Sequence, residues 1–168
     1  MSFQNLVELY VLSSLRRLHT VPLKNVRSAI AYLREAVRTD HPLADCELLT
    51  DRSDLFVEKA GKYLNLSRAG QLEMKEQLER CMMQVDRGMD GFPDRLRLMD
   101  PKNESIVAAE VDPAIRFGQP RIPGTGIPTA IIYERSAGET ASQLAAVYES
   151  SVTEVISAIN YEESSRAA

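Results

Sequence analysis

The segment FGQPRIPGTGIPT, residues 117–129, holds three prolines and three glycines, a composition that can serve phosphate recognition. A phosphate-binding P-loop has the pattern GxxxxGK[ST], in which a lysine reaches the terminal phosphates, and this segment contains no lysine. The glycines of a dinucleotide-binding fingerprint are not in register either, and each proline removes an N–H donor that a phosphate would need. We therefore expect no nucleotide site in this segment.

Acidic residues recur in DRGMDGFPDRLR, residues 86–97, in a pattern that resembles a calcium-binding loop. Gly88 stands where a ligand is needed, however, and Arg97 replaces the closing glutamate. We interpret Asp86, Asp90 and Asp94 as turn-forming aspartates that hydrogen-bond their own backbone. No serine, cysteine or lysine nucleophile motif is present, so we expect neither an enzyme nor a metal or cofactor.

Length and composition place the chain among globular proteins of one domain or two small ones. It has 168 residues, of which 44% are hydrophobic and 26% charged, and a net charge of −4. The charge is uneven: residues 1–41 carry +3, residues 42–110 carry −4 and residues 111–168 carry −3. If the protein has a nucleic-acid surface, it is therefore expected near the amino terminus; the alternative is that these basic residues form the solvated faces of two helices. No apolar run approaches the roughly 18 residues of a membrane span, and we expect a cytoplasmic protein.

Residues 1–41 are predicted to form a helix pair. Apolar side chains follow one another at steps of three and four residues in the second half of this segment, which indicates one face of a helix. They are Leu23, Val26, Ile30, Leu33 and Val37. A rougher stripe precedes the turn at Pro22. It comprises Leu6, Tyr10 or Leu9, Leu15 and Leu18.

Residues 42–112 are predicted to form a small α+β module. Three short apolar runs, at 47–50, 54–58 and 63–67, are separated by turn-forming residues, as in β-hairpins. An amphipathic helix is expected from residue 70 until Gly88, followed by strands in DRLRLM and SIVAAEV.

Residues 113–168 are predicted to form a three-helix domain with a helix-turn-helix arrangement. One helix is expected between Pro128 and Gly138, and the motifs TASQ and SVTE each match a capping box that starts a further helix. Both later helices carry apolar side chains that we expect to face inward. They are Leu144, Val147 and Tyr148, followed by Val152, Val155, Ile156 and Ile159. The predicted fold class of the whole chain is therefore α+β.

The proline-rich strand that leads into this domain is a candidate dimer interface. Prolines restrict strand pairing to an edge, and glycines permit close approach of a second backbone. A purely structural module, in which this strand pairs with its twin across a two-fold axis, is therefore one interpretation. The residues concerned are Pro120, Ile122, Gly124, Thr125 and Ile127.

The carboxy-terminal segment resembles the bacterial family of uncharacterised domain number 433. That family has a Gly-x-Pro-x-Ile-x-Gly-Thr-x-Ile-Pro lead, a later Gly-x-(Ser/Thr)-x-x-x-(Leu/Ile) and two tyrosines. The matching positions run from residue 118 to residue 161. They are Gly118, Pro120, Ile122, Gly124, Thr125, Ile127, Pro128, Gly138, Thr140, Leu144, Tyr148, Ala158 and Tyr161. Most members of the family carry arginine where this chain has Gly126.

The upstream part is similar to VapB-type antitoxins that join this domain to an amino-terminal DNA-binding region. The similarity covers SFQNLVELYVLSSLRR, VPLKNVRSAIAYLRE and shorter pieces up to LNLSRAGQ. Relatives of this type carry a MerR-like helix-turn-helix before this point, so residues 1–41 would be the remnant of that region. The resemblance implies an antitoxin of a type II toxin–antitoxin system that binds and neutralises a PIN-domain ribonuclease and autoregulates its operon.

A PIN active site is a carboxylate cluster that holds Mg²⁺ or Mn²⁺, so an arginine placed among those carboxylates would block it. The candidates for this contact are Arg116, Arg121, Arg135 and Arg166. The alternative function is a DNA-binding regulator that acts as a dimer without a toxin. Its phosphate contacts would come from Arg16, Arg17, Lys24 and Arg27. The predicted last helix is a poor DNA reader, because it offers several glutamates and almost no basic residue.

Overall fold

The structure is a computed structural model that describes residues 2–18, 30–31, 34–35, 38–44, 57–58 and 68–167. The chain forms two compact units, Met1–Asp94 and Arg95–Ala168. The middle segment predicted from the sequence, 42–112, spans this division. The predicted boundaries after residues 41 and 112 stay predictions.

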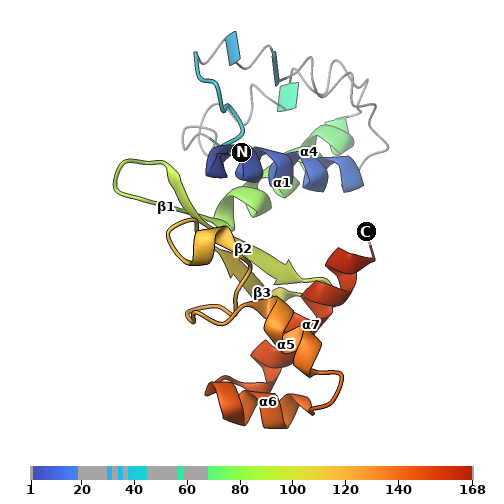
Figure 1. The fold of residues 1–168 in the computed structure, drawn as a ribbon. Coiled ribbons are helices and arrows are strands. Elements are labelled where there is room, and N and C mark those ends of the chain that lie inside the picture. Colours follow the sequence, from blue (N-terminus) through green and yellow to red (C-terminus); the bar gives the residue numbers. More distant parts are fainter. Residues whose placement is uncertain are drawn as a thin grey trace. The chain divides into compact units, whose positions relative to one another are not determined.

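The first unit is built on two helices of 16 residues each, α1 (Phe3–Leu18) and α4 (Arg68–Met83), which contact one another (Figure 1). Both helices place apolar side chains every four residues toward a common core, as expected for one face of a helix. Its buried members on the two helices are Val7 and, in one cluster, Val11, Leu15, Met74, Leu78, Cys81 and Met82, and Leu43 and Val57 belong to the same cluster. The described helices include none that is both long enough and apolar enough to cross a membrane.

The first helix of the predicted pair is confirmed as α1, but its buried stripe differs from the prediction. Val7 and Val11 are buried, whereas Leu6 and Tyr10 are only half-buried. The predicted stripe is therefore one residue out of phase at its first two positions, whereas the predicted Leu15 is buried in the core. Of the second predicted helix, only residues 30–31 and 34–35 are described, and these are helical.

The three predicted hairpin strands of the middle segment are largely outside the described residues. The exception is the pair Val57 and Glu58, which is helical, so the predicted strand at 54–58 is wrong at these two positions. A short apolar run such as DLFVE does not distinguish a strand from a buried piece of helix.

A three-stranded sheet follows α4, in the order β1 (Val85–Arg87), β2 (Pro93–Asp100), β3 (Asn103–Val111). The predicted strands DRLRLM and SIVAAEV are thus confirmed as β2 and β3. They pair antiparallel, from Leu96 opposite Val111 to Asp100 opposite Asn103, with two register shifts on the way. The helix predicted to run until Gly88 instead ends at Met83, and β1 takes up the residues between.

The turn between β1 and β2 confirms the interpretation of one aspartate. Gly88 and Phe92 share a backbone hydrogen bond of 3.0 Å, and the carboxylate of Asp90 accepts the N–H of Phe92 at 3.1 Å. Gly91 has φ +78°, a conformation that favours glycine. Asp90 therefore shapes its own turn, as proposed from the sequence.

The second unit contains three helices, α5 (Thr129–Arg135), α6 (Ala141–Tyr148) and α7 (Val152–Arg166). Both predicted capping boxes are confirmed. Gln143 N–H donates to the Thr140 hydroxyl at 3.3 Å, and Thr140 N–H donates back to the Gln143 side chain at 2.8 Å. The corresponding bonds between Ser151 and Glu154 measure 3.1 and 2.7 Å. These bonds satisfy N–H groups that the first turn of each helix leaves without a partner.

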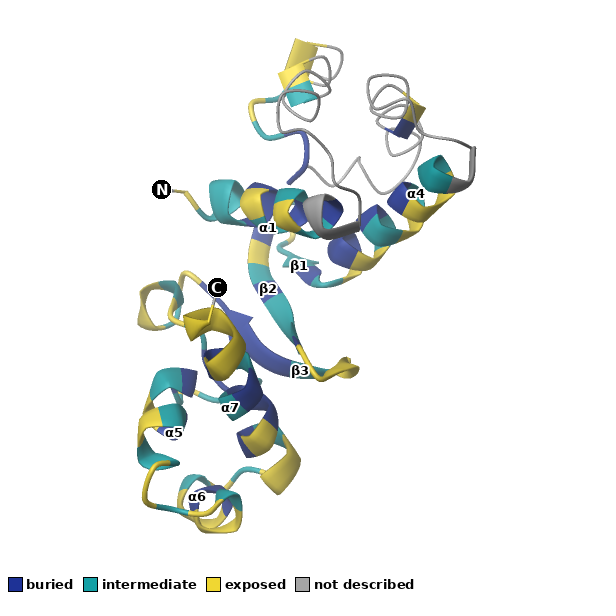
Figure 2. Cartoon of the chain, turned by 90° about the vertical axis from the view of Figure 1, so that its right-hand side faces the viewer, coloured by how far each residue is buried: buried dark blue, intermediate teal, exposed yellow. Residues whose placement is uncertain are grey.

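Helix α7 is the centre of the second unit, because it contacts α5, α6 and β3 (Figures 1 and 2). The core under these helices has six buried members. They are Ile122, Ile132, Leu144, Ala145, Val155 and Ala158. The helix-turn-helix arrangement of the three helices stays a prediction.

Three side chains expected in this core are exposed instead. Val147 is 56% exposed, Val152 41% and Ile156 46%, so the prediction that they face inward is wrong. The inward face of α7 is occupied by Val155 and Ala158, which are fully buried. An apolar side chain on a short helix does not reveal which side of that helix meets its neighbours.

A buried polar cluster fixes the β2–β3 turn to α7. The carboxylate of Asp100, 3% exposed, accepts the backbone N–H of Lys102 at 2.8 Å and the amide of Asn160 at 3.1 and 3.3 Å. The Lys102 ammonium in turn donates to Asn160 at 2.7 Å and to Glu163 at 3.1 Å. Burial by itself would raise the pKa of Asp100, but the hydrogen bonds from Lys102, Asn160, Ser157 and Asn103 outweigh it and the pKa is lowered.

Candidate partner-binding site

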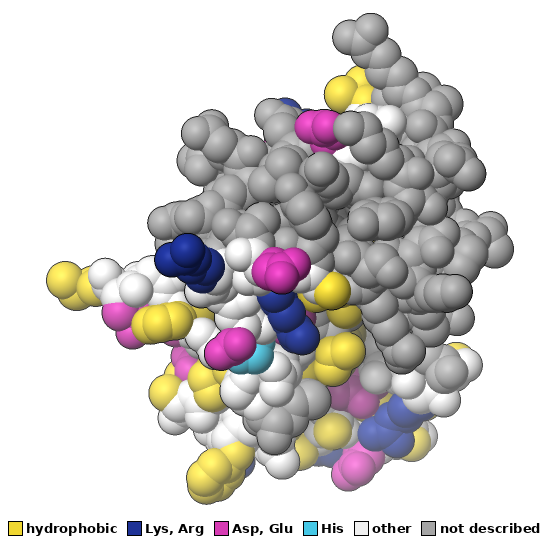
Figure 3. All heavy atoms as spheres, turned by 90° about the horizontal axis from the view of Figure 1, so that it is seen from above, with side chains coloured by type: hydrophobic (Ala, Val, Ile, Leu, Met, Phe, Trp, Pro, Cys, Tyr) yellow, Lys and Arg dark blue, Asp and Glu magenta, His cyan; other side chains and the backbone are white. Residues whose placement is uncertain are grey.

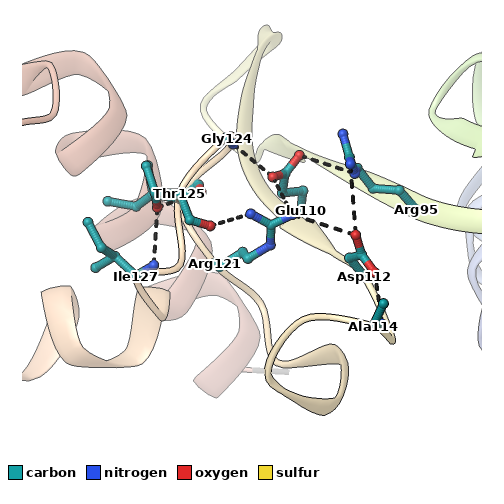
Figure 4. Close-up of polar contacts among 9 residues, drawn as sticks. Arg95, Glu110, Asp112, Ala114, Arg121, Gly124, Thr125 and Ile127 are labelled. Carbon is teal, nitrogen blue, oxygen red and sulfur yellow. Dashed lines mark hydrogen bonds and ion pairs between the residues drawn. The ribbon is translucent and has the colours of Figure 1, made fainter.

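A buried cluster of charges surrounds Arg121, where the proline-rich segment meets the end of β3 (Figure 4). The Arg121 guanidinium lies 2.8 Å from a carboxylate oxygen of Glu110 and 3.8 Å from one of Asp112. Arg95, from β2, approaches the same two carboxylates at 3.7 and 3.8 Å. The Arg121 side chain is only 4% exposed. It is therefore occupied inside the protein, and the geometry does not favour its predicted contact with a partner.

The backbone of the proline-rich segment is held by the same residues. Glu110 and Arg121 exchange two backbone hydrogen bonds of 2.9 and 3.1 Å, so the segment pairs with β3 of its own chain. The Glu110 carboxylate also accepts the N–H of Gly124 at 2.7 Å, and the Arg121 guanidinium donates to the carbonyl of Thr125 (Figure 4). Charge-assisted bonds of this kind are stronger than neutral ones. The segment is a closed hairpin fixed to β3.

The five residues predicted for a dimer interface share this hairpin but not their exposure. Ile122 is fully buried in the core, Pro120, Thr125 and Ile127 are half-buried, and Gly124 is exposed at the tip with φ +70°. Ile122 donates its N–H to the carbonyl of Ile127 at 2.9 Å. Because Ile122 and the backbone of Arg121 are engaged within the chain, pairing with a twin strand stays a prediction that this geometry does not favour.

Arg135, on α5, is held by neighbours on its own surface. Two of its guanidinium nitrogens donate to the carboxylate of Glu139, both at 2.6 Å, and a third donates to the Tyr148 hydroxyl at 2.9 Å. These hydrogen bonds raise the pKa of Arg135 and lower the pKa of Glu139. The fork of Arg135 is thus already filled by a bidentate partner, which any external carboxylate would have to displace.

Arg166, near the end of α7, is engaged in a similar way. Its guanidinium lies 4.4 Å from the centre of the Tyr133 ring, and its Nε lies 3.4 Å from a carboxylate oxygen of Glu162. Glu162 is buried and accepts the Thr129 hydroxyl at 2.5 Å. Arg166 therefore ties the last turn of α7 to α5, while about half of its side chain stays exposed.

Arg116 differs from the other three arginines. It lies on an exposed turn, Arg116–Gly118, and makes no side-chain hydrogen bond or ion pair with any described residue. The side chain of its neighbour Phe117 is fully exposed to solvent. Of the four arginines proposed as partner contacts, Arg116 alone is free within the described part of the chain.

The sequence of this unit matches a known family model. Residues 110–161 match the family described as "Protein of unknown function (DUF433)". These residues form a DUF433 domain. The first of the two resemblances found in the sequence is thereby confirmed, and the Arg121 cluster, the proline-rich hairpin and all three helices lie wholly or mostly within the matched range.

The fold of the chain is similar to a solved structure. The crystal structure of Rv2018 from Mycobacterium tuberculosis gives a TM-score of 0.72 at 22% sequence identity, covering 95% of this chain and 78% of that one. At this identity the likeness concerns the fold. No curated protein matches the sequence. The VapB-type and MerR-like resemblances stay predictions.

The charges around the DUF433 domain are mainly acidic. The second unit, residues 95–168, has seven basic and ten acidic residues, a net charge of −3. Figure 3 shows acidic, basic and apolar side chains interspersed among the described residues of one face. Of the predicted phosphate contacts, Arg16 and Arg17 belong to α1, but their side chains, like Lys24 and Arg27 altogether, are outside the described residues.

The described residues present neither a metal cluster nor a strongly enclosed polar site. No group of three His, Cys, Asp or Glu side chains there is arranged to hold a metal ion. An open cavity of about 430 Å³ in the first unit is lined by side chains of both charges, among them Arg38, Asp40 and Asp90. His41, at its wall, is bonded to Glu8 at 3.1 Å. Burial raises the pKa of the Cys81 thiol, which suits a core residue better than a nucleophile.

Sequence reasoning missed the residues that make the site what it is. Glu110 and Asp112 were not singled out, although they neutralise Arg121, and Phe117 was passed over beside Arg116. The one signal for Phe117 was its place at the start of a segment rich in glycine and proline, a composition typical of exposed loops. The pairing of Glu110 with Arg121 left no local signal, because it depends on the return of the chain to β3.

Proposed function

We propose that this protein acts by binding another protein, as an antitoxin that neutralises a PIN-domain ribonuclease toxin by direct contact. The observation that carries the proposal is the exposed face of α7. Val152 and Ile156 lie four residues apart on that helix, and each is more than 40% exposed. Together these two β-branched side chains give the open face of α7 an apolar strip that another protein can cover.

The electrostatics of the same helix argue for protein rather than nucleic acid. Before Arg166, α7 has no lysine or arginine, and it carries three glutamates. Binding to a phosphate backbone depends on several lysines or arginines that release counterions. A helix with this composition supplies none of those contacts where a recognition helix needs them, near its amino-terminal end.

The identity of the partner comes from the resemblance to VapB-type antitoxins. A PIN ribonuclease holds its metal ions in a carboxylate cluster, which binds RNA only while it is open to solvent. A domain with a net charge of −3 is not drawn to such a cluster by its overall field. Recognition must therefore come from apolar contacts together with a few well-placed cations, and Arg116 is the free one among the four proposed.

Co-expression tests this function. The protein and the PIN-type ribonuclease encoded beside it should purify as a stable complex that lacks ribonuclease activity. The double variant Val152→Asp with Ile156→Asp should lose the complex, because it places two charges in an apolar interface. Met89→Asp, at a fully exposed apolar position of the first unit, is the control and should keep it. Recovery of two separate wild-type proteins would count against the proposal.

Autoregulation of the operon is part of the same proposal and rests on the amino-terminal region. Residues 1–41 carry +3, and α1 places Arg16 and Arg17 near its carboxy-terminal end. A gel-shift series with the upstream promoter region over increasing salt should show specific binding that weakens steeply with salt. The double variant Arg16→Gln with Arg17→Gln should lose roughly two phosphate contacts, so the slope of log affinity against log salt should become shallower by about two. Light scattering of the free protein tests the expected homodimer.

A further inference from the structure

The exposed turn Arg116–Gly118, which we call the RFG turn, has a backbone that most residues avoid. Three consecutive residues have left-handed φ angles: +48° at Arg116, +57° at Phe117 and +76° at Gly118. Only glycine adopts this region without steric cost, so the arginine and the phenylalanine are both held there against their preference. Strained residues of this kind persist only where the surrounding structure fixes them.

The fold fixes the RFG turn from both sides. Upstream, Asp112 belongs to the Arg121 cluster and also accepts the N–H of Ala114 at 2.8 Å and, through its carbonyl, that of Ile115 at 3.1 Å. Downstream, Pro120 accepts the N–H of Thr129, the first residue of α5, at 3.0 Å. Within the turn, Gly118 donates to the carbonyl of Ile115 at 3.1 Å.

The ring of Phe117 contributes nothing to the interior of the domain, since it is fully exposed. The cluster at Arg121 therefore helps to hold a turn whose two side chains, the Phe117 ring and the Arg116 guanidinium, both face solvent. Aromatic and arginine side chains are the commonest energetic centres of protein interfaces. A turn that is already in its bound shape loses little conformational entropy on binding.

We propose that the RFG turn is a preformed docking anchor: Phe117 enters an apolar pocket of the partner, and Arg116 pairs with a carboxylate at the rim of that pocket. The occupant is the PIN ribonuclease, so the inference rests on the proposed function and adds the residues that make the contact. Charge complementarity supports this choice, because Arg116 has no partner among the described residues and a PIN ribonuclease presents carboxylates around its metal site. Arg121 is a positioning residue for the anchor.

The variant Phe117→Gly separates binding from folding. Glycine relieves the left-handed backbone, so the melting temperature should stay the same or rise by a few degrees. The dissociation constant for the purified ribonuclease should rise roughly thirtyfold, as for the loss of an interface centre. Arg116→Gln should raise it roughly tenfold and make it less sensitive to salt. Met89→Ala, at an exposed apolar position of the first unit, is the matched control and should leave it unchanged.

The measurement is calorimetric titration of the ribonuclease with the full chain, together with its inhibition in an RNA cleavage assay. If wild type binds and Phe117→Gly binds equally well, the anchor is overturned while the proposed function stands. If wild type itself does not bind, both fall. If Phe117→Gly instead converts a dimer to a monomer in light scattering without changing ribonuclease binding, the turn joins two copies of this chain and the inference is wrong.

Discussion

Arg116 and Arg121 lie five positions apart on the same stretch of chain, and their surroundings are opposite. Arg121 is 4% exposed, and its charge is met by Glu110 and Asp112. Arg116 is exposed, has no partner among the described residues and stands next to a fully exposed phenylalanine. Arg121 pairs with β3 and closes the hairpin, whereas Arg116 lies on the exposed turn and contacts solvent.

The difference shows how one segment both holds a shape and presents it. A buried arginine with two carboxylates has a high cost of desolvation, which only good geometry recovers. Arg121 also contacts Asp112, which precedes the RFG turn, and the carbonyl of Thr125, which follows it, so it fixes the backbone on both sides of that turn. The exposed arginine adds nothing to the fold and is free for a partner. The residue type is the same at both positions, and both lie in the segment that leads from β3 to α5.

The largest effect is expected when the buried arginine is removed. Arg121→Met leaves Glu110 and Asp112 buried with only the more distant Arg95 to neutralise them. The free energy of unfolding should fall by about 3–5 kcal/mol, as for other broken buried ion pairs. Urea unfolding followed by circular dichroism measures this loss. Arg116→Met, at the exposed position, should change the same quantity by no more than about 0.5 kcal/mol.

Arg95→Gln provides the graded control for that experiment. Arg95 approaches the same two carboxylates, but at 3.7 and 3.8 Å and with 39% of its side chain exposed. Solvent screens such a pair, so a loss of about 1 kcal/mol or less is expected. Equal losses at positions 95, 116 and 121 would show that burial does not separate these arginines.

Local signals in the sequence were enough to predict the helices and strands of the second unit. TASQ and SVTE gave the starts of α6 and α7, because a capping box involves only four consecutive residues. The strand β2 followed from the alternation of polar and apolar residues in DRLRLM, and β3 from the short apolar run SIVAAEV. The match of residues 110–161 to the DUF433 family followed from a pattern of glycines and prolines that is also local.

Burial on the helices was predicted less well, for a physical reason. Val152 and Ile156 are apolar and correctly spaced for one helix face, yet the buried face of α7 is the one with Val155 and Ala158. Which face is buried depends on where β3 and α5 lie, and these contacts link residues 20 to 60 positions apart. The roles of Arg116 and Arg121 were indistinguishable for the same reason, because the carboxylates of Glu110 and Asp112 come into place only when the hairpin folds onto β3.

The buried carboxylate of Asp100 offers a contrast with those of Glu110 and Asp112, because neutral N–H donors and not arginines bond to it. Asp100 is held by Asn160 and by the backbone of Lys102, and its pKa is lowered in the folded state. Asn160→Ala should reduce the free energy of unfolding by about 2 kcal/mol at neutral pH, the usual loss for a hydrogen bond to a charged group. Glu163→Gln, at the exposed edge of the same cluster, should change it by less than about 0.5 kcal/mol.

The pH dependence of the same variant follows from the sign of the shift. A carboxylate with a lowered pKa in the folded protein stabilises the fold above the pKa of the unfolded chain, near 3.9, and that contribution is lost as the pH falls through the folded value. Wild type should therefore lose stability on acidification below about pH 5. The Asn160→Ala variant should lose less stability over the same range, because it lacks one of the hydrogen bonds that lower the Asp100 pKa. Parallel curves for the two proteins would contradict this assignment.

The smallest effect is expected at the tip of the proline-rich hairpin, where Gly124 and Gly126 can be compared. The two glycines differ in one respect, their backbone conformation. Gly124 has φ +70° and Gly126 does not have a positive φ, while a Cβ atom at either position would meet nothing within 4 Å. Gly124→Ala should therefore cost about 1 kcal/mol of backbone strain, and Gly126→Ala should be neutral or slightly stabilising. Because the N–H of Gly124 donates to Glu110, the strained variant should also weaken the anchoring of the segment that Arg121 holds. Thermal unfolding of both variants measures the difference. If Gly126→Ala caused a loss of the same size, the left-handed backbone at Gly124 would not be the cause of the loss. An added methyl group at the tip would then be unfavourable wherever it is placed.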